Sequence, residues 1–348
     1  MILENNTKRK EMALKDIMEK TKGKNQDYVP LYLENYTMDH GQPIPLWFKF
    51  VQFWLRLLVK IFLQPRKGPV GDLNIHEVEG VYNREALTYD IKHHLTTHGM
   101  DLMWRRWAGW GIVNIGRDKK GQISVLDLCT GTGLAIKEMA ILLSEWGIKC
   151  FITGLDYNVK MLNVARSRNI KHKDIDISYV RGDAMNLVQD VQPPTEIKQF
   201  TPNSFDAVTQ VFGIGGIDSP SNVFKNVLQI LKPGGQFFLT DMHHPITSQP
   251  GEWPFMLKWF SSPRFEALVY REITLPLVLN RLWGWRDTTL NFYLLPLITY
   301  IDEEGIKWGF KVVVFEYEAQ RWWFNLPIMP IAKIVVEKVR IDDNDFKN

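Results

Sequence analysis

The segment from Gln122 to Ala135 constrains the fold of this chain more than any other. It reads Gln-Ile-Ser-Val-Leu-Asp-Leu-Cys-Thr-Gly-Thr-Gly-Leu-Ala, a short apolar strand followed by a turn with two glycines and then by a helix expected over 134–146. Gly131 and Gly133 allow the backbone to approach a bound ligand closely. Open α/β sheets bind their ligands at this edge, beyond the carboxyl ends of the strands. The segment therefore predicts a nucleotide-binding α/β fold.

Two residues around this turn indicate which nucleotide it binds. A dinucleotide site would carry a third glycine where this chain has Ile136, so the pyrophosphate-binding pattern is incomplete. Asp127, just before the turn, would repel a pyrophosphate but can accept hydrogen bonds from an ammonium group, directly or through water. S-adenosylmethionine carries such a group. The turn therefore favours S-adenosylmethionine over a nicotinamide cofactor.

Carboxylates also end the next two expected strands. The strand that begins at Cys150 ends at Asp156, where an acidic residue can accept hydrogen bonds from both hydroxyls of an adenosine ribose. The strand that begins at Ile177 leads to Asp183, whose carboxylate can receive the adenine amino group. Tyr157 or Met185 can then pack on the adenine ring. Taken in order along the chain, these residues predict one adenosine-binding edge.

The remaining elements complete an alternating pattern. A strand over 205–213 opens into the turn 214–217, where a methyl acceptor would meet the sulfonium. A helix over 222–231, a strand over 236–241 and two strands near 311–318 and 334–340 follow. The expected fold is α/β, a Rossmann-like sheet of seven mostly parallel strands with a terminal antiparallel hairpin, occupying residues 81–348.

The N-terminal extension, residues 1–80, contains an unusual apolar segment over 45–63. Its polar residues Lys49, Gln52, Arg56 and Lys60 recur at spacings of three and four, which at about 100° per residue places them on one helical stripe. Three cations argue against a helix that spans a bilayer. Two alternatives stay open: the helix lies in a membrane interface, or it is buried against the catalytic domain with a thin solvated edge.

A second apolar region is an aromatic-rich insertion over 246–300, which includes Trp253. It reads as a lid that binds a hydrophobic substrate. Alternatively, it packs on the N-terminal helix and completes one core.

Composition excludes several other classes. The formal net charge of +3 gives no sign of a nucleic-acid-binding protein. Two cysteines, without metal-ligand spacing, predict neither a disulfide framework nor a metal site. His93, His94 and His98 are expected on helix surfaces. The first thirty residues lack the apolar core of a secretory signal, so we expect a cytoplasmic protein that lies peripherally at the membrane.

Four motifs resemble those of class I S-adenosylmethionine-dependent methyltransferases: Val-Leu-Asp-Leu-Cys-Thr-Gly-Thr-Gly, Gly-Leu-Asp-Tyr, Gly-Asp-Ala-Met and Leu-Lys-Pro-Gly-Gly, within residues 125–241. Upstream, a Tyr-Asp step at Tyr89 and Asp90, and the run from Gly99 to Trp104 and Arg105, resemble the ubiquinone/menaquinone C-methyltransferase family. In that family these elements cover the cofactor and help to form the acceptor pocket. The chain departs from the family where Gly-Ile-Gly-Gly-Ile after Phe212 replaces a Gly-Leu-Arg-Asn segment.

The resulting function is methyl transfer from S-adenosylmethionine to a hydrophobic, membrane-resident acceptor, either a prenylated quinone precursor or a lipid. Methylating a phenolic carbon or oxygen requires loss of a proton, for which Asp90, His243 and His244 are candidate bases. The acceptor would contact Trp104, Phe212 and Trp253. The candidate cofactor-binding residues are Tyr89, Asp127, Thr130, Gly131, Gly133, Asp156, Tyr157, Asp183, Ala184, Met185 and Gln210.

Three alternatives remain at this point. The enzyme could methylate the amine of a lipid headgroup, or an oxygen or nitrogen of a small hydrophobic metabolite. A nicotinamide-dependent oxidoreductase is disfavoured by Ile136 and by the lack of a Tyr-x-x-x-Lys pair. A non-catalytic binding module is disfavoured by the complete set of glycines and carboxylates. The sequence does not indicate an oligomeric state.

Overall fold

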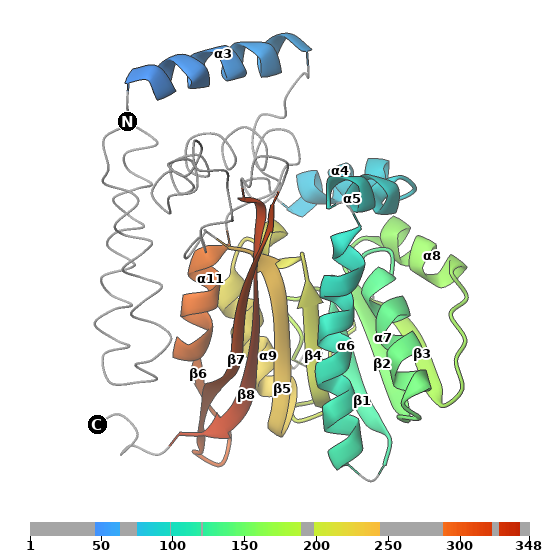
Figure 1. Cartoon of the computed structure of the whole chain (residues 1–348). Helices are drawn as coiled ribbons and strands as arrows, with labels where there is room; N and C mark the ends of the chain where they lie inside the picture. Colours follow the sequence, from blue (N-terminus) through green and yellow to red (C-terminus); the bar gives the residue numbers. More distant parts are fainter. Residues whose placement is uncertain are drawn as a thin grey trace, which may run out of the picture.

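The computed structural model describes residues 46–62, 75–97, 99–119, 121–188, 198–243, 288–321 and 327–341. Its strands are β1 (Ile123–Leu128), β2 (Cys150–Asp156), β3 (Ile175–Arg181), β4 (Phe205–Val211), β5 (Leu231–Met242), β6 (Thr299–Ile301), β7 (Lys307–Arg321) and β8 (Pro327–Arg340). They form one sheet in the order β3-β2-β1-β4-β5-β8-β7-β6 (Figure 1). The predicted Rossmann-like α/β fold is confirmed.

Strand direction divides the sheet into two parts. The five strands from β3 to β5 are parallel, so their carboxyl ends meet at one edge. β8 pairs antiparallel with β5, and β7 pairs antiparallel with β8, which is the predicted terminal hairpin. The sheet has one strand more than the seven expected, because the three residues of β6 pair with β7 at its edge.

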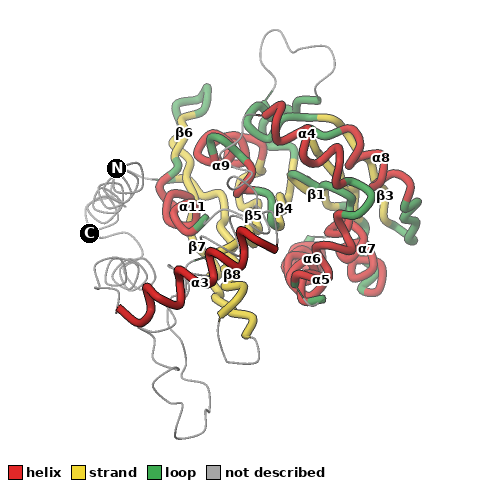
Figure 2. The backbone as a smooth tube through the Cα atoms, turned by 90° about the horizontal axis from the view of Figure 1, so that it is seen from above, coloured by secondary structure: helices red, strands yellow, loops and turns green. Residues whose placement is uncertain are grey.

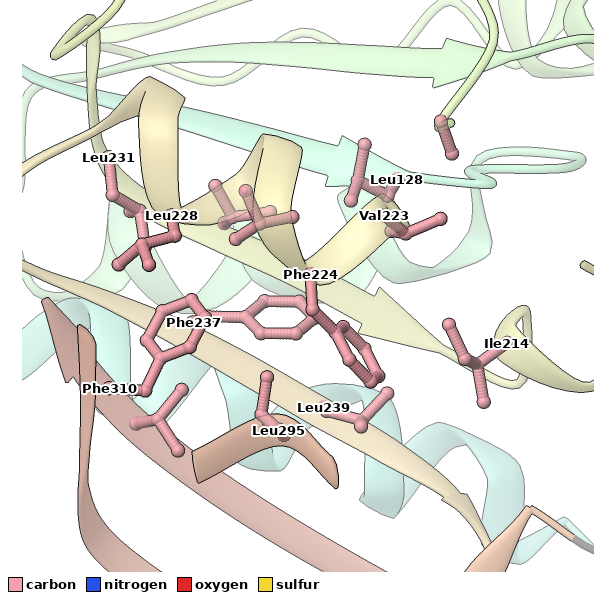
Figure 3. Close-up of a cluster of buried hydrophobic side chains, with 14 of the residues drawn as sticks. Leu128, Ile214, Val223, Phe224, Leu228, Leu231, Phe237, Leu239, Leu295 and Phe310 are labelled. Carbon is pink, nitrogen blue, oxygen red and sulfur yellow. The ribbon is translucent and has the colours of Figure 1, made fainter. Parts of the chain in front are cut away.

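Helices cover both faces of the sheet, with α9 and α11 on one face and α6 and α7 on the other. The described helices are α3 (Leu46–Phe62), α4 (Ile75–Glu85), α5 (Tyr89–Thr96), α6 (Met100–Asp118), α7 (Leu134–Glu145), α8 (Val159–Ser167), α9 (Pro220–Ile230) and α11 (Thr289–Leu294), with 3-10 turns η2 (Ile214–Gly216) and η5 (Leu295–Leu297). Side chains alternate across the sheet. Phe237 therefore joins the core beneath α9 and α11, whereas Phe238 joins the core beneath α6 and α7 (Figure 3 shows the former). The apolar strands thus form a sheet buried on both faces.

Two short helices, α4 and α5, lie across the carboxyl ends of the parallel strands (Figure 1). α4 begins at Ile75, so the predicted boundary between residues 80 and 81 falls within this helix. Most of the predicted insertion, residues 246–287, lies outside the described residues. Its last part forms α11, η5 and β6. The cover of the carboxyl edge therefore begins earlier in the chain than the motifs indicate.

The burial of α3 differs from the sequence-based expectation. Gln52, in the predicted polar stripe, is only 8% exposed, whereas Phe50 and Trp54 are 64% and 47% exposed. A thin solvated edge on a buried helix would show the opposite pattern. Within the part of the chain that the structure describes, no helix is both long enough and apolar enough to cross a membrane.

Candidate active site

A cavity lies at the carboxyl edge of the parallel strands. Its wall combines α4 and α5, the turn after β1, the ends of β2 and β3, and the turn after β4. The lining residues are Val78, Glu79, Tyr82, Tyr89, Cys129, Gly131, Leu155, Asp156, Tyr157, Asn158, Met161, Gly182, Asp183, Ala184, Met185, Phe212, Gly213, Gly216, Ile217 and Asp218. Segments more than a hundred residues apart thus meet in one site, as the strand topology requires.

Asp156 organises the centre of this cavity. One carboxylate oxygen accepts a hydrogen bond from the Gly131 N–H at 2.8 Å, and the other accepts one from the Asn158 N–H at 2.8 Å. Burial raises the pKa of Asp156, and these backbone donors act in the opposite direction. Gly131 has a φ of +56°, a left-handed conformation that glycine adopts without strain. The carboxylate therefore holds the glycine turn against the cavity and remains placed to accept ribose hydroxyls.

Four predicted residues continue the wall beyond Asp156: Tyr157, Asp183, Ala184 and Met185. The Asp183 carboxylate accepts a hydrogen bond from the Met185 N–H at 2.9 Å. The Arg181 guanidinium lies 5.2 Å from the centre of the Tyr157 ring and fixes its position from the outside. This region offers an acceptor for an amino group beside an aromatic ring and a thioether. Their contacts with an adenine ring stay a prediction.

Four other predicted cofactor residues do not line the cavity: Asp127, Thr130, Gly133 and Gln210. The Asp127 carboxylate accepts hydrogen bonds from the Thr130 hydroxyl at 2.6 Å and from the Thr209 hydroxyl at 2.7 Å. Burial raises the pKa of Asp127 to about 6. The structure therefore assigns Asp127 to bracing the glycine turn against β4.

The turn after β4 forms the far side of the cavity. Phe212 has a φ of +60°, and the preceding turn places Cys129 at +52°. A Cβ atom on Gly213 would lie 2.7 Å from the Cys129 Cβ, so only glycine allows these two turns to approach this closely. Trp104 is fully buried in α6, with its ring 5.5 Å from the Phe212 ring. Phe212 therefore lines the cavity, whereas Trp104 does not line it and supports Phe212 from behind. The contact of Phe212 with the acceptor stays a prediction.

The expected exposure of His93 is wrong. This side chain is 3% exposed and packs between two cavity residues, with ring centres 5.5 Å from Tyr89 and 5.1 Å from Phe212. Its Nδ1 lies 3.7 Å from the Asp101 carboxylate. Burial lowers the pKa of His93, which favours the neutral imidazole. The helical spacing of α5 did not indicate the burial of His93, because the turn after β4, which covers this side chain, is far away in the sequence. His98 lies outside the described residues.

The predicted bases lie away from the cavity wall. The Asp90 carboxylate pairs with Arg168 and accepts a hydrogen bond from the Thr132 hydroxyl at 2.5 Å. His243 is 1% exposed and is surrounded by aromatic rings, those of Phe292, Tyr293, Phe315 and Tyr317. His244 and Trp253 lie outside the described residues. The structure brings neither Asp90 nor His243 to the surface of the cavity.

Several wall residues were missed by the sequence analysis, and α4 supplies the most informative ones. Glu79 and Tyr82 line the cavity. The Asn158 side-chain amide donates to the Glu79 carbonyl oxygen at 3.2 Å and to the Asn83 side-chain oxygen at 3.1 Å. Asn158 also caps α8 by accepting from the Met161 N–H at 3.0 Å. The position of Asn158, two residues after Asp156, is the sequence feature that could have indicated a site residue here.

The charge of the wall suits S-adenosylmethionine. It carries the four carboxylates of Glu79, Asp156, Asp183 and Asp218, and none of the described residues that line it is Lys, Arg or His. Such a surface favours a ligand with net positive charge. Across the described residues, no group of three or more His, Cys, Asp or Glu side chains is arranged to hold a metal ion.

Comparisons with known proteins agree with this geometry. A model of the ubiE/COQ5 methyltransferase family matches residues 70–268. A demethylmenaquinone methyltransferase of Thermotoga maritima is 31% identical over 243 residues, which are 68% of this chain and 90% of that protein. One of Leptospira interrogans is 25% identical over 263 residues, 74% of this chain and 92% of that protein.

Among solved structures, the phosphoethanolamine N-methyltransferase 1 of Haemonchus contortus, in complex with phosphoethanolamine and S-adenosylhomocysteine, is 16% identical with a TM-score of 0.47, covering 78% of this chain and 51% of that one. The family match spans more than half of the chain and includes α4, the glycine turn and all five parallel strands. The chain is an S-adenosylmethionine-dependent methyltransferase and belongs to the ubiE/COQ5 methyltransferase family.

Proposed function

We propose that this enzyme methylates a ring carbon of a hydrophobic, membrane-resident quinol, the reduced form of a quinone precursor. The observation that carries the proposal is the aromatic wall of Tyr82, Tyr89 and Phe212, which lies in the same cavity as the carboxylates of Asp156 and Asp183. Aromatic side chains pack well on a flat ring. The curated relatives named as demethylmenaquinone methyltransferases support the same class of acceptor.

The residues of the chain contribute alignment and exclusion of water. Asp156 and Asp183 would hold the two ends of the adenosine, and Gly131 would let the backbone approach it. When bound, S-adenosylmethionine supplies the methyl group on a sulfonium. Tyr89 and Phe212 would hold the acceptor ring on the opposite side of the cavity, in line with that methyl group. α4 and α5 cover the cavity and limit the access of water.

Methylation of a ring carbon would form one carbon–carbon bond, break the methyl–sulfur bond of the sulfonium and release the ring proton to a base or to water. Ionisation of a quinol hydroxyl makes the ring carbon nucleophilic, so removal of that proton is the step in which a base helps most. Burial raises the pKa of Tyr89 to about 12, so this hydroxyl stays protonated and acts as a hydrogen-bond donor to the acceptor oxygen. Asp90, His243 and His244 stay predictions as bases, and neither Asp90 nor His243 lines the described wall of the cavity.

A second function is favoured by the charge of the wall. Glu79 and Asp218 add two carboxylates beyond the two that would contact the adenosine, and the turn after Phe212 lacks a cation. A phenolate would be repelled there, whereas an amine would be attracted. The second candidate is therefore an N-methyltransferase that acts on the amine of a lipid headgroup. Either acceptor lies in a bilayer, so we place the enzyme in the cytoplasm, peripherally at the membrane.

The test is transfer of labelled methyl groups to vesicles that contain either a prenylated quinol or phosphatidylethanolamine. Label in the quinol supports the first function, label in the phospholipid supports the second, and label in neither overturns both.

Calorimetry tests the cofactor site of the same protein. We expect micromolar binding of S-adenosylmethionine and no binding of NADH. Asp156→Ala should lose this binding, because the variant loses the acceptor for the ribose and the brace of the glycine turn. Asp176→Ala is the matched control, since Asp176 is exposed on the adjacent strand β3. Equal loss in both variants would contradict the assigned role of Asp156.

A further inference from the structure

The helix α3 lies outside the residues that match the family model, yet it carries the most apolar exposed surface of the described chain. Its exposed apolar side chains are Leu46, Trp47, Phe50, Val51, Phe53, Trp54, Leu58 and Ile61. At about 100° per residue, these positions fall on one side of the helix, and Gln52, which is 8% exposed, falls on the opposite side. The covered side of α3 is thus the side of Gln52, and its outward side is apolar.

Charge is arranged along one border of this apolar side. Lys49 and Arg56 are exposed, and Lys60 follows at the same helical spacing. The segment 46–62 contains no acidic residue. A helix that faces water would carry polar residues on its outward side. A helix that binds in an apolar groove of another protein would not need a row of cations beside its apolar side. Apolar and aromatic side chains beside a row of cations are the pattern of helices that lie in the interface of an anionic bilayer.

The position of α3 agrees with such a contact. α3 lies at the end of the molecule where α4 and α5 cover the cavity (Figures 1 and 2). A second set of exposed apolar side chains occurs in this cover: Leu87 is 87% exposed, Ile91 65% and Leu95 67%. Both sets of exposed apolar side chains therefore lie at the same end of the molecule.

We propose that α3 is a membrane-docking helix, which inserts its outward apolar side into the interface of a bilayer that contains anionic phospholipid. The α4–α5 cover then faces the same bilayer and brings the mouth of the cavity to lipid-soluble acceptors. The choice of acceptor rests on the proposed function, but the docking itself does not. The cations Lys49 and Arg56 lie within the helix, which fits an orientation in the plane of the interface rather than across the bilayer.

Vesicle flotation of the full-length protein tests this proposal directly. The wild type should float with vesicles of phosphatidylglycerol and phosphatidylcholine, and at least tenfold less with phosphatidylcholine alone. Phe50→Ser combined with Trp54→Ser should reduce flotation at least tenfold, because both side chains belong to the outward side. Lys49→Ser combined with Arg56→Ser should remove the preference for anionic vesicles and its sensitivity to salt.

Ile301→Ser is the matched control, since Ile301 is 64% exposed on β6, at the other end of the molecule (Figure 1). It should float as the wild type does. All variants should bind S-adenosylmethionine equally, which shows that they are folded. Wild-type flotation that survives the Phe50 and Trp54 substitutions would overturn the proposal. The proposal would also be overturned if the wild type does not float but forms a dimer that these substitutions dissociate. The helix would then bind a second copy of the chain.

Methyl transfer separates this proposal from the proposed function. With a long-chain quinol in vesicles, the Phe50 and Trp54 variant should lose at least tenfold in rate. With a water-soluble, short-chain quinol it should keep the wild-type rate. If the wild type floats but methylates neither quinol, the proposed reaction is wrong and the proposal of a docking helix is retained. If it methylates both quinols without floating, the proposal of a docking helix is wrong and the proposed reaction is retained.

Discussion

Single residues set the shape of the cavity where two turns approach each other. A Cβ on Gly213 would lie 2.7 Å from the Cys129 Cβ and 3.0 Å from the Gln210 amide. Gly213→Ala should therefore destabilise the fold by about 1–3 kcal/mol and weaken cofactor binding. Gly121→Ala is the control, because a Cβ there meets no atom within 4 Å. Thermal unfolding and calorimetry measure both effects.

A second substitution makes the Gly213 prediction specific. Cys129 has a φ of +52°, so Cys129→Gly relieves its backbone and removes the obstructing Cβ. The double variant should recover part of the lost stability. Additive losses in the double variant would show that the contact between the two turns is not the cause.

Asp127 should make stability depend on pH. Its folded pKa is raised to about 6 by burial, above the ordinary value of 3.8. The folded state therefore favours the protonated acid. The stabilisation that protonated Asp127 gives the fold is fully present below about pH 4 and is lost as the pH rises through 6. The loss is on the order of 3 kcal/mol. Asp127→Asn should remove this slope in chemical unfolding between pH 4 and 7. Equal slopes in the wild type and the variant would refute the assignment.

At the scale of elements, α5 is tied to the glycine turn through Arg168. The Arg168 guanidinium pairs with Asp90 at the start of α5 and donates to the Thr132 carbonyl oxygen at 2.5 Å. Arg168→Met should loosen α5, because it removes both contacts at once. We expect faster amide exchange over residues 89–96 and a five- to thirtyfold weaker affinity for S-adenosylmethionine, or about 1–2 kcal/mol.

Arg166→Met is the control for α5. Arg166 lies two residues earlier, and its hydrogen bonds to Asn163 and to the Tyr179 carbonyl oxygen are exposed. This variant should leave exchange in α5 unchanged. If both variants loosen α5 equally, the effect comes from the end of α8 and not from the Asp90 contact.

At the scale of the whole molecule, Lys338 joins the C-terminal hairpin to the centre of the sheet. This side chain of β8 is 1% exposed, and its Nζ donates to the Asn203 side-chain oxygen and to the Leu231 carbonyl oxygen, both at 2.8 Å. Burial lowers its pKa to about 8. Lys338→Met leaves buried acceptors without a donor, so unfolding should require about 1–3 kcal/mol less.

The pH dependence of Lys338 has the opposite sign to that of Asp127. The folded state releases the proton near pH 8 and the unfolded state near 10.5, so the stability of the wild type relative to Lys338→Met should rise between these values. Lys311→Met, at an exposed position of β7, should show neither effect in denaturant titrations. A wild-type advantage that falls over this pH range would contradict the buried amine.

The sequence alone determined the alternation of strands and helices along the chain, the glycine turn and the positions of Asp156 and Asp183 at strand ends. These features depend on local patterns, namely alternating apolar residues, turn glycines and carboxylates at strand ends. They place the cofactor site because parallel strands end at one edge.

Only the tertiary structure decided what faces these residues. The burial of His93 and Gln52, the approach of Gly213 to Cys129, and the position of Glu79 in the wall all involve partners far apart in sequence or sides of helices that periodicity does not distinguish. Likewise, only the structure shows that Asp127 braces the glycine turn, because the Thr209 hydroxyl of β4 donates to its carboxylate; its contact with the cofactor stays a prediction. Spacing indicates which residues lie at an edge, whereas packing decides which of them reach the cavity.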